Sequence, residues 1–329
     1  MLIDPFKRKI SYIRVSVTDR CDFRCSYCMP QKMKFLSRDN LLSLEELERL
    51  CNVFIELGVR KIRITGGEPL VRKNVMQLFK GISNNLGKGL EELTLTTNGS
   101  QLERYAEELF NYGVKRINIS LDTLDRNKFK SITRFDNFDK VIRGIHAAKK
   151  IGMKIKINAV ALKDINDNEI LDLVNWCGEN QFTLTFIEVM PMGEMGKRRV
   201  DQFMPLSKVR SLIETNYKIF DDTFKSGGPA TYVHCNETNQ KIGFITPLTH
   251  NFCESCNRVR ITCTGRMYMC LGQEDKEDLL KPLRNTNNND LLKEVIYKAI
   301  LRKPKGHDFV TVREKKEKLV PRYMNVTGG

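Results

Sequence analysis

The chain has 329 residues, with 55 Lys and Arg against 40 Asp and Glu, and 41% of its residues are hydrophobic. Domain lengths cluster at about 100 to 200 residues, so two domains, or one large domain with an appendage, are expected. This apolar content is enough for a buried core and excludes intrinsic disorder. No uncharged apolar run approaches the roughly 18 residues of a membrane span, and the start of the chain has no signal-peptide pattern. We therefore expect a cytoplasmic protein that does not enter a membrane.

The formal net charge of +15 bears on partners rather than on fold. A long-range positive field attracts nucleic acid, acidic surfaces or multiply anionic small molecules. Part of the excess is expected on a solvated C-terminal face, which carries Arg302, Lys303, Lys305, Arg313, Lys315, Lys316 and Lys318. In a reducing compartment, the ten cysteines are more plausible as metal ligands than as a disulfide framework.

Short β-branched runs alternate with amphipathic stretches in the first 190 residues, which is typical of βα units on a parallel sheet. The expected strands are Tyr12–Val17, Lys61–Thr65, Leu93–Thr97, Val114–Leu121, Lys154–Val160 and Thr183–Val189. The expected helices are Ser43–Leu57, Val75–Asn84, Leu102–Tyr112, Phe138–Lys150 and Glu169–Cys177. Ser43 followed by Glu46 three residues later predicts a capping box at the first helix. The pattern predicts an α/β fold with six βα units.

The alternation fades from about Pro205 onward, where Gly-Pro turns and an Asn-rich stretch replace it. We therefore expect a domain boundary there, with residues 1–204 forming the first domain and residues 205–329 the second. No low-complexity tract is long enough to serve as a linker, so the two parts are expected to pack together.

Cys21, Cys25 and Cys28 form a C-x3-C-x2-C motif immediately after the first expected strand. The same offsets fit three cysteines on one face of a buried helix. Polar residues between the cysteines and the following Pro30 favour an ordered loop instead. Three thiolates on a [4Fe–4S] cluster leave one iron open for a substrate or cofactor. Structural zinc would need a fourth ligand, and none lies nearby in the sequence.

A second group of cysteines, Cys253, Cys256 and Cys270, has the spacing C-x2-C-x13-C and encloses Arg258 and Arg260. One interpretation is a small zinc ribbon with Cys263 as its fourth ligand. The other interpretation is a second site with three ligands, and the neighbouring motifs favour it.

The first cysteine motif, with an aromatic residue before its last cysteine, resembles the signature of the radical S-adenosylmethionine (SAM) enzymes. Thr65-Gly66-Gly67-Glu68-Pro69 is similar to the glycine-rich stretch of that family, and glycines suit a backbone that must approach a ligand closely. With the second cysteine group and the terminal Gly328-Gly329, the chain resembles the GTP 3',8-cyclase subfamily from Arg14 to Gly329.

The resemblance implies a partial (βα)6 TIM-like barrel of the radical SAM type with a C-terminal iron–sulfur domain. It implies two [4Fe–4S] clusters, one held by Cys21, Cys25 and Cys28 and one held by Cys253, Cys256 and Cys270. SAM contacts are expected at Tyr27, Gly67, Ser120 and Met190. GTP contacts are expected at Arg14, Lys61, Arg63, Thr96, Lys156, Arg258 and Arg260. The residues expected to act in catalysis are Arg258, Arg260, Gly328 and Gly329.

The implied reaction belongs to molybdenum cofactor biosynthesis. Reductive cleavage of SAM gives a 5'-deoxyadenosyl radical that abstracts the 3' hydrogen of GTP, and the resulting carbon radical attacks C8 of the guanine. The product is (8S)-3',8-cyclo-7,8-dihydroguanosine 5'-triphosphate, so the enzyme is a lyase. Expected partners are an electron donor such as flavodoxin or ferredoxin and the cyclic pyranopterin monophosphate synthase that acts next, with a homodimer as a compatible assembly.

Several expected ligand contacts fall at or just beyond the ends of the expected strands, where parallel α/β sheets bind their ligands. Arg and Lys also suit a triphosphate, which accepts charge-assisted hydrogen bonds. Two alternatives remain at this stage. One is another two-cluster radical SAM enzyme, for instance one that modifies RNA, and the other is a non-catalytic metal protein that binds nucleic acid.

Overall fold

The computed structural model describes residues 1–193, 201–250, 252–307, 309 and 320–328. Within these ranges, none of the helices combines the length and the apolar character that crossing a membrane requires.

A single twelve-stranded sheet organises the structure, and its strands follow the order β12-β11-β10-β1-β2-β3-β4-β5-β6-β9-β8-β7. From β10 to β9 the neighbouring strands are parallel, whereas the outer pairs are antiparallel. The first six strands are β1 (Tyr12–Ser16), β2 (Lys61–Thr65), β3 (Glu92–Thr97), β4 (Arg116–Ser120), β5 (Lys154–Ala161) and β6 (Thr183–Glu188). The others are β7 (Ile219–Asp222), β8 (Thr231–Cys235), β9 (Gln240–Ile245), β10 (Arg258–Ile261), β11 (Arg266–Tyr268) and β12 (Lys276–Asp278).

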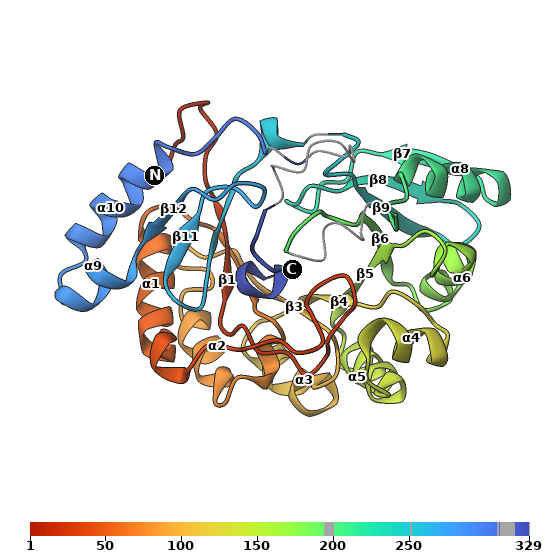
Figure 1. The fold of residues 1–329 in the computed structure, drawn as a ribbon, viewed down its shortest axis with the longest axis horizontal. Coiled ribbons are helices and arrows are strands. Elements are labelled where there is room, and N and C mark those ends of the chain that lie inside the picture. Colours follow the sequence, from red (N-terminus) through yellow and green to blue (C-terminus); the bar gives the residue numbers. More distant parts are fainter. Residues whose placement is uncertain (194–200, 251, 308, 310–319, 329) are drawn as a thin grey trace.

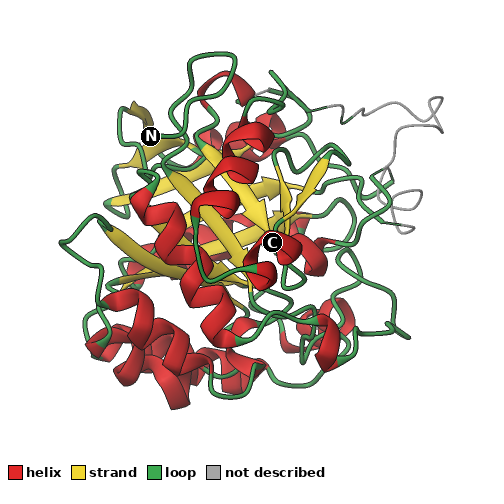
Figure 2. Ribbon diagram, turned by 90° about the vertical axis from the view of Figure 1, so that its left-hand side faces the viewer, coloured by secondary structure: helices red, strands yellow, loops and turns green. Residues whose placement is uncertain are grey.

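Helices cover the outer side of the curved sheet, and the short C-terminal helix lies at the centre of the view in Figure 1. Figure 2 shows the same layering from the side, with strands inside and helices outside. The helices that follow β1 to β5 are α1 (Leu44–Glu56), α2 (Val75–Ser83), α3 (Leu102–Asn111), α4 (Arg126–Thr133), α5 (Phe138–Lys150) and α6 (Ile170–Glu179). The later helices are α8 (Leu206–Asn216), α9 (Leu280–Asn285), α10 (Asp290–Ile300) and α11 (Met324–Thr327). Short 3-10 turns are η1 (Arg38–Asn40), η2 (Pro69–Val71), η3 (Asp167–Glu169) and η4 (Cys253–Ser255).

The six expected strands and the five expected helices of the first half are all present, with ends that shift by at most two residues. The structure adds α4, which sequence periodicity did not indicate. It also adds strands from the second half at both edges of the parallel sheet, because β10 pairs with β1 and β9 pairs with β6. The strands of residues 205–329 therefore do not form a sheet of their own, and the division into two domains stays a prediction.

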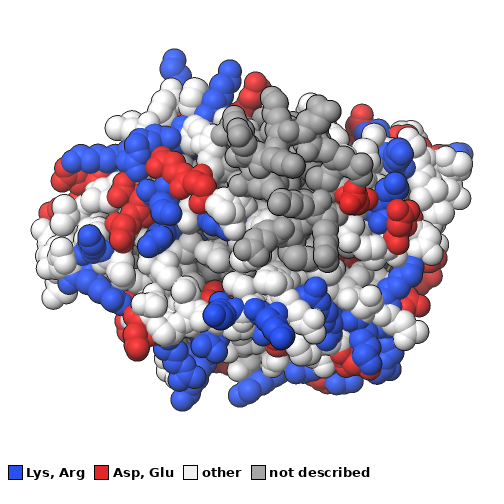
Figure 3. All heavy atoms as spheres, in the orientation of Figure 1, with Lys and Arg blue, Asp and Glu red and all other residues white. Residues whose placement is uncertain are grey.

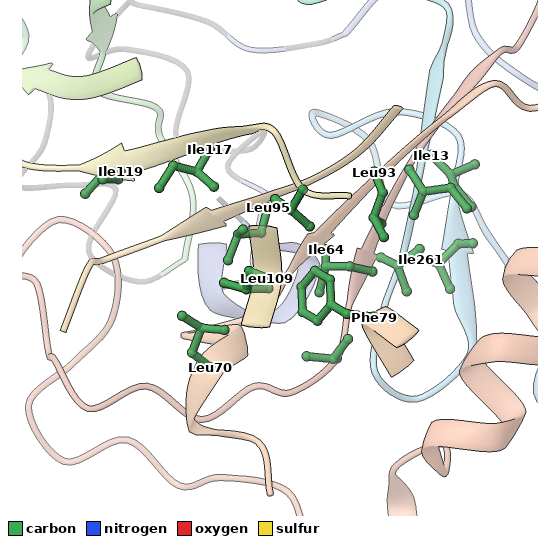
Figure 4. Close-up of a cluster of buried hydrophobic side chains, with 14 of the residues drawn as sticks. Ile13, Ile64, Leu70, Phe79, Leu93, Leu95, Leu109, Ile117, Ile119 and Ile261 are labelled. Carbon is green, nitrogen blue, oxygen red and sulfur yellow. The ribbon is translucent and has the colours of Figure 1, made fainter. Parts of the chain in front are cut away.

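The core lies between the sheet and the outer helices. Alternate strand residues such as Ile13, Ile64 and Leu95 are fully buried and point away from the inner face. Figure 4 shows these side chains packed with Phe79 of α2 and Leu109 of α3. Because side chains alternate between the two faces of a strand, this packing directs the remaining strand residues toward the inside of the barrel.

The first helix begins with the predicted capping box. The Ser43 hydroxyl accepts a hydrogen bond from the Glu46 amide, and the Glu46 carboxylate accepts one from the Ser43 amide. Both bonds satisfy amide groups that have no partner inside the helix.

Replacement of Ser43 by Ala is expected to lower the free energy of unfolding by about 1 kcal/mol, because one capping bond is lost. Urea unfolding of the two proteins measures this difference. Ser37→Ala is the matched control, since Ser37 precedes η1 without a side-chain capping bond. An equal loss in both variants would show that the cap contributes nothing specific.

Candidate active site

The inner face of the sheet is rich in cations around β1. The register places Arg14 of β1 between Arg260 of β10 and Arg63 of β2, one residue from each of three neighbouring strands. The same side of these strands carries Arg258 and Lys61, which flank Tyr12. Arg258 and Arg260 point to the same side of β10, because both line the same cavity.

This cavity encloses about 1110 Å³ of space, part of it open to solvent. That volume is ample for a nucleotide-sized ligand. Its charged and polar walls include Arg14, Lys61, Arg63, Arg116, Asn118, Lys156, Asn158, Arg258 and Arg260. At one end the walls are formed by Cys253, Cys256 and Cys270. Lys156 lies within β5, and its side chain faces this cavity as expected.

Burial makes the cationic layer electrostatically costly. Burial, followed by repulsion from neighbouring arginines, lowers the pKa of Arg14 to about 10 and that of Arg260 well below its usual range. The pKa of Lys156 is also lowered well below its usual range, first by burial and then by Arg63 and Arg116. Figure 3 shows other Lys and Arg side chains on the surface, gathered along the lower edge over α2 to α5. The positive charge of the chain is thus divided between the surface and an interior that suits an anionic ligand.

Tyr12 belongs to the same layer, although we did not predict it as a site residue. Burial raises its pKa, but four cations, led by Arg63 and Arg14, outweigh this effect and bring the pKa to about 7. The sequence did offer a signal: Tyr12 lies two residues before Arg14 on one strand, so their side chains face the same side. Arg116 was also missed, and it lies in the cavity with its guanidinium paired to Glu92.

The first cysteine motif forms a loop after β1, which excludes the alternative of a buried helix face. Cys21, Cys25 and Cys28 line one cavity together. Burial raises the pKa of Cys21 and Cys25, and repulsion among the thiolates adds to the effect. Three thiolates so placed need a compensating positive charge, which the metal of a cluster would supply.

The glycine-rich stretch packs against the backbone that leads into this loop. A Cβ atom at Gly67 would lie 2.3 Å from the Arg20 carbonyl oxygen, and one at Gly66 would lie 2.8 Å from that of Thr18. The Gly67 amide also donates to the Thr18 carbonyl at 2.7 Å. Glycine is therefore required here by a close approach of the chain to itself, as well as by the adjoining cavity.

A third cavity connects the other two. It shares Asn158 and Met190 with the large cationic cavity, and it shares Tyr27, Thr96 and Ser120 with the cysteine cavity. The Tyr27 hydroxyl donates a hydrogen bond of 2.7 Å to Asp122, another residue that sequence reasoning missed. Burial raises the pKa of Asp122 more than this hydrogen bond lowers it, so that the pKa is about 6.

The second cysteine group lines the large cavity. Cys253 is in η4, Cys256 follows it, and Cys270 comes after β11. Cys263 is buried at the other end of β10, where Asp19 and Arg72 affect its pKa. This position gives no support to the alternative of a zinc ribbon with Cys263 as its fourth ligand. In the described part of the chain, no three His, Cys, Asp or Glu side chains are arranged around a single metal ion. The cysteines of a cluster bind different irons and can stand farther apart.

Two buried cations hold this second cysteine group in place. Lys303 was expected on a solvated face, but its side chain is only 2% exposed. Its ammonium donates to the carbonyl oxygens of Met269 and Arg258 at 2.6 and 3.0 Å and lies 3.6 Å from the Cys256 sulfur. Arg8 donates to the Cys253 carbonyl at 2.6 Å. The expectation for Lys303 was wrong because a charge-rich sequence does not show which of its lysines or arginines will meet carbonyl groups in the fold. Arg313, Lys315, Lys316 and Lys318 lie outside the described residues.

The C-terminal segment ends inside the barrel. A guanidinium nitrogen of Arg260 donates to the Gly328 carbonyl at 2.7 Å, and the Asn325 amide donates to the Asp19 carbonyl at 2.9 Å. Gly328 has φ +74°, and an added Cβ atom would lie 2.1 Å from the Thr65 hydroxyl oxygen. Thr327 is fully buried. Gly329 lies outside the described residues.

Comparison with known proteins identifies the family. Residues 15–177 match the Radical SAM superfamily, and residues 182–309 match the Molybdenum Cofactor Synthesis C family. The chain is 61% identical over 329 residues to the GTP 3',8-cyclase of Mesorhizobium japonicum, covering all of this chain and 99% of that protein. It is 59% identical to the GTP 3',8-cyclase of Paracoccus denitrificans, covering all of this chain and 96% of the relative. The chain belongs to the GTP 3',8-cyclase family.

The fold agrees with this assignment. The crystal structure of Streptococcus suis SuiB bound to S-adenosylmethionine superposes with a TM-score of 0.64 at 17% sequence identity. The alignment covers 97% of this chain and 77% of SuiB. At such low identity the likeness concerns the fold alone, and it confirms the radical SAM type of barrel.

The resemblance to the GTP 3',8-cyclase family predicted site residues on almost every strand of the barrel. The structure brings these residues together. Each residue expected to bind SAM, GTP or a cluster lines at least one of the three connected cavities. Gly328 does not line them but contacts Arg260 of the large cavity. The individual roles of these residues remain predictions.

Gly328→Ala is expected to displace the C-terminal segment, because the added methyl group would overlap the Thr65 hydroxyl. Hydrogen exchange of residues 320–328 should become faster, while the melting temperature of the barrel should change little. Gly87→Ala is the matched control, since Gly87 has φ +75° with open space around its Cα. Equal effects of the two substitutions would attribute the change to backbone strain rather than to the contact with Thr65.

Proposed function

We propose that this chain converts GTP into a 3',8-cyclised nucleotide as a radical SAM lyase of molybdenum cofactor biosynthesis. Membership of the GTP 3',8-cyclase family supports the activity. The structural observation that carries the assignment of residues is the row of three connected cavities, with cysteine groups at both ends and a cationic layer beside the second.

Cys21, Cys25 and Cys28 would hold a [4Fe–4S] cluster, and Tyr27, Gly67, Ser120 and Met190 would contact SAM. The fit rests on three converging thiols, on the raised thiol pKa values that a metal would reverse, and on two glycines that keep the neighbouring backbone close. When bound, the cluster and SAM together supply a radical that abstracts hydrogen. The protein fixes the position of the ligand and excludes water from the cavity around it.

Cys253, Cys256 and Cys270 would hold the second cluster. Burial raises the pKa of Cys253 and Cys270, whereas Arg258 and Lys303 outweigh burial and lower the pKa of Cys256 to about 7. The Cys256 thiol is therefore easily deprotonated, which is the form that binds a metal. An open iron at this site would face the large cavity, which is where we place the guanine of GTP.

The cationic layer would bind and orient GTP through Arg14, Lys61, Arg63, Thr96, Lys156, Arg258 and Arg260. Guanidinium groups offer paired donors to phosphate oxygens, and lysine offers a compact charge. Binding of the polyanion would also relieve the repulsion among these buried cations. The ribose would then lie between the layer and the connecting cavity, within reach of the SAM end.

Arg258, Arg260 and the terminal glycines are proposed to act on the reacting nucleotide. The hydrogen bond between Arg260 and the Gly328 carbonyl links the C-terminal segment to the cationic layer. A segment without side chains can lie in a narrow space beside the ribose and order the cavity for hydrogen abstraction.

The proposal extends to the partners that the reaction requires. Reduction of the first cluster needs an electron donor, and a small carrier such as flavodoxin or ferredoxin fits that requirement. The cyclised triphosphate would pass to the cyclic pyranopterin monophosphate synthase. The proposed division into residues 1–204 and 205–329 separates the two cysteine groups, although β9 and β10 join the two parts into one sheet.

Two clusters predict about eight irons per chain after anaerobic reconstitution. Cys21→Ala should abolish SAM cleavage, because the first cluster binds SAM. Cys270→Ala should keep some SAM cleavage and lose the cyclised product. Iron analysis and chromatography of both reaction products measure these effects. Cys263→Ala is the control and should keep the full iron content, since its thiol lies away from both groups. An equal loss of SAM cleavage from Cys21→Ala and Cys270→Ala would refute the division of roles.

Deletion of Gly328 and Gly329 should stop formation of the cyclised product while leaving iron content and GTP affinity nearly unchanged. The segment contacts the layer through one backbone carbonyl and adds little to the core. Turnover of GTP by the shortened chain at the parental rate would show that the segment is dispensable.

A further inference from the structure

Tyr232 contacts Lys156 of the cationic cavity from a strand outside the parallel part of the sheet. It lies on β8, where its Cα is paired with Gly243 of β9, and Gly243 is paired in turn with Thr185 of β6. A Cβ atom at Gly243 would lie 2.8 Å from the Tyr232 ring and 2.9 Å from the Thr185 hydroxyl oxygen. The missing side chain at Gly243 thus leaves a path across β9 for the phenol ring, which is only 3% exposed.

The phenol group connects a lysine of the cavity to a nearby loop. The Lys156 ammonium donates to the Tyr232 oxygen at 2.7 Å, and the Tyr232 hydroxyl lies 3.0 Å from the Ser226 hydroxyl. The Lys61 ammonium donates to the Ser226 carbonyl at 3.0 Å. Both lysines that we assign to GTP are therefore tied to one residue, Ser226.

Ser226 begins a short segment, residues 226–229, that we call the closing loop. Its Gly228 and Pro229 line the large cavity, while Gly227 and Gly228 are exposed to solvent. The closing loop therefore separates the lysine side of the cavity from solvent. Phe224, just before it, packs edge-on against Tyr232 with ring centres 5.0 Å apart.

The charges around Lys156 explain why it needs this phenol. Cations face it from two strands, Lys61 and Arg63 of β2 and Arg116 of β4. Glu92 of β3 is an acidic group near these cations, and it is paired with Lys61 and Arg116. A phenol oxygen that accepts a hydrogen bond from the Lys156 ammonium favours its charged form without introducing a negative charge that would repel a phosphate.

We propose that Tyr232 is a positioning residue for the polyphosphate of the nucleotide. It directs the Lys156 ammonium into the cavity and, through Ser226, holds the closing loop over the part of the cavity that Lys61 and Lys156 line. This inference rests on the proposed function and deepens it, since it locates the phosphate end of the site. When a polyphosphate binds, its oxygens replace the Ser226 carbonyl as the acceptor of the Lys61 hydrogen bond. The closing loop then stays attached through Tyr232 and covers the ligand.

The test compares Tyr232→Phe with the wild-type protein, both loaded with iron and kept anaerobic. The substitution keeps the ring and removes the hydroxyl, so the dissociation constant of GTP should rise on the order of tenfold, as expected for a lost bond to a charged group. The dissociation constant of inorganic triphosphate should rise by a similar factor. That of guanosine should change less than about twofold, because guanosine has no phosphate to meet Lys156.

The pH dependence distinguishes positioning from a general loss of structure. Burial and the facing cations already lower the pKa of Lys156, so GTP affinity should fall as rising pH removes its proton. In Tyr232→Phe the charged form of Lys156 loses the phenol oxygen as its acceptor. The fall in GTP affinity should therefore occur at lower pH than in the wild-type protein. A merely structural defect would weaken binding equally at every pH.

Tyr217→Phe is the matched control, because its hydroxyl bonds to Asn175 away from the cavity. It should leave GTP binding unchanged. Ser226→Ala removes only the link from the closing loop to Tyr232 and should weaken GTP binding by a smaller factor, and it serves as the deciding variant if Tyr232→Phe fails to fold.

Four outcomes would overturn the inference. Three concern Tyr232→Phe: unchanged GTP binding, an equal loss for guanosine, or a loss that is equal at every pH. The fourth, which applies when Tyr232→Phe does not fold, is unchanged binding by Ser226→Ala. Failure of the wild-type protein to bind GTP would instead refute the proposed function.

Discussion

The burial of a layer of like charges is the constraint on which the rest of the structure depends. Arg14, Arg63 and Arg260 come from adjacent strands and lie at the same level of the barrel. Such a layer is stable only if neighbouring groups or a ligand compensate for it, because buried charge is costly in a medium of low polarity. Glu92 and Tyr12 offer partial compensation within the protein. The remaining imbalance supports our proposal that the cavity binds a polyanion. The apolar packing on the other face of the same strands holds the cations in place.

The second half of the chain completes this layer and does not merely cover it. Strand β10 brings Arg258 and Arg260 to the edge of β1, and β8 brings Tyr232 across β9 to Lys156. The same half provides the second cysteine group and, at its end, the Gly328 carbonyl that accepts from Arg260. The site therefore cannot be assembled from the first six strands alone, and its two ends depend on pairing between residues far apart in the sequence.

Periodicity predicted the strands of the first half well because their apolar residues alternate beneath regular helices. It missed β10, where only Val259 and Ile261 are apolar. It also could not show that β10 would pair with β1 and β9 with β6, at the two ends of the parallel run of strands. The resemblance to a family supplied every Lys and Arg of the large cavity except Arg116. It missed Tyr12 and Tyr232, whose importance depends on register. Tyr12 becomes a site residue only beside Lys61 and Arg63, and Tyr232 only because Gly243 leaves it room.

The same limit applies to charge. Arg302 and Lys303 are adjacent in a basic stretch, yet one is exposed and the other is buried against three groups of the second cysteine region. Composition describes the sum of such charges, whereas their roles follow from the carbonyls and thiols that the fold places around them. The most direct test of the central claim is thermal unfolding of the iron-loaded protein with GTP or with guanosine, both at the concentration that saturates the GTP site. A ligand at a hundred times its dissociation constant adds about 2.7 kcal/mol to stability. If the cationic layer is a polyanion site, GTP should raise the melting temperature far more than an equal concentration of guanosine does, and equal shifts for the two ligands would contradict the account.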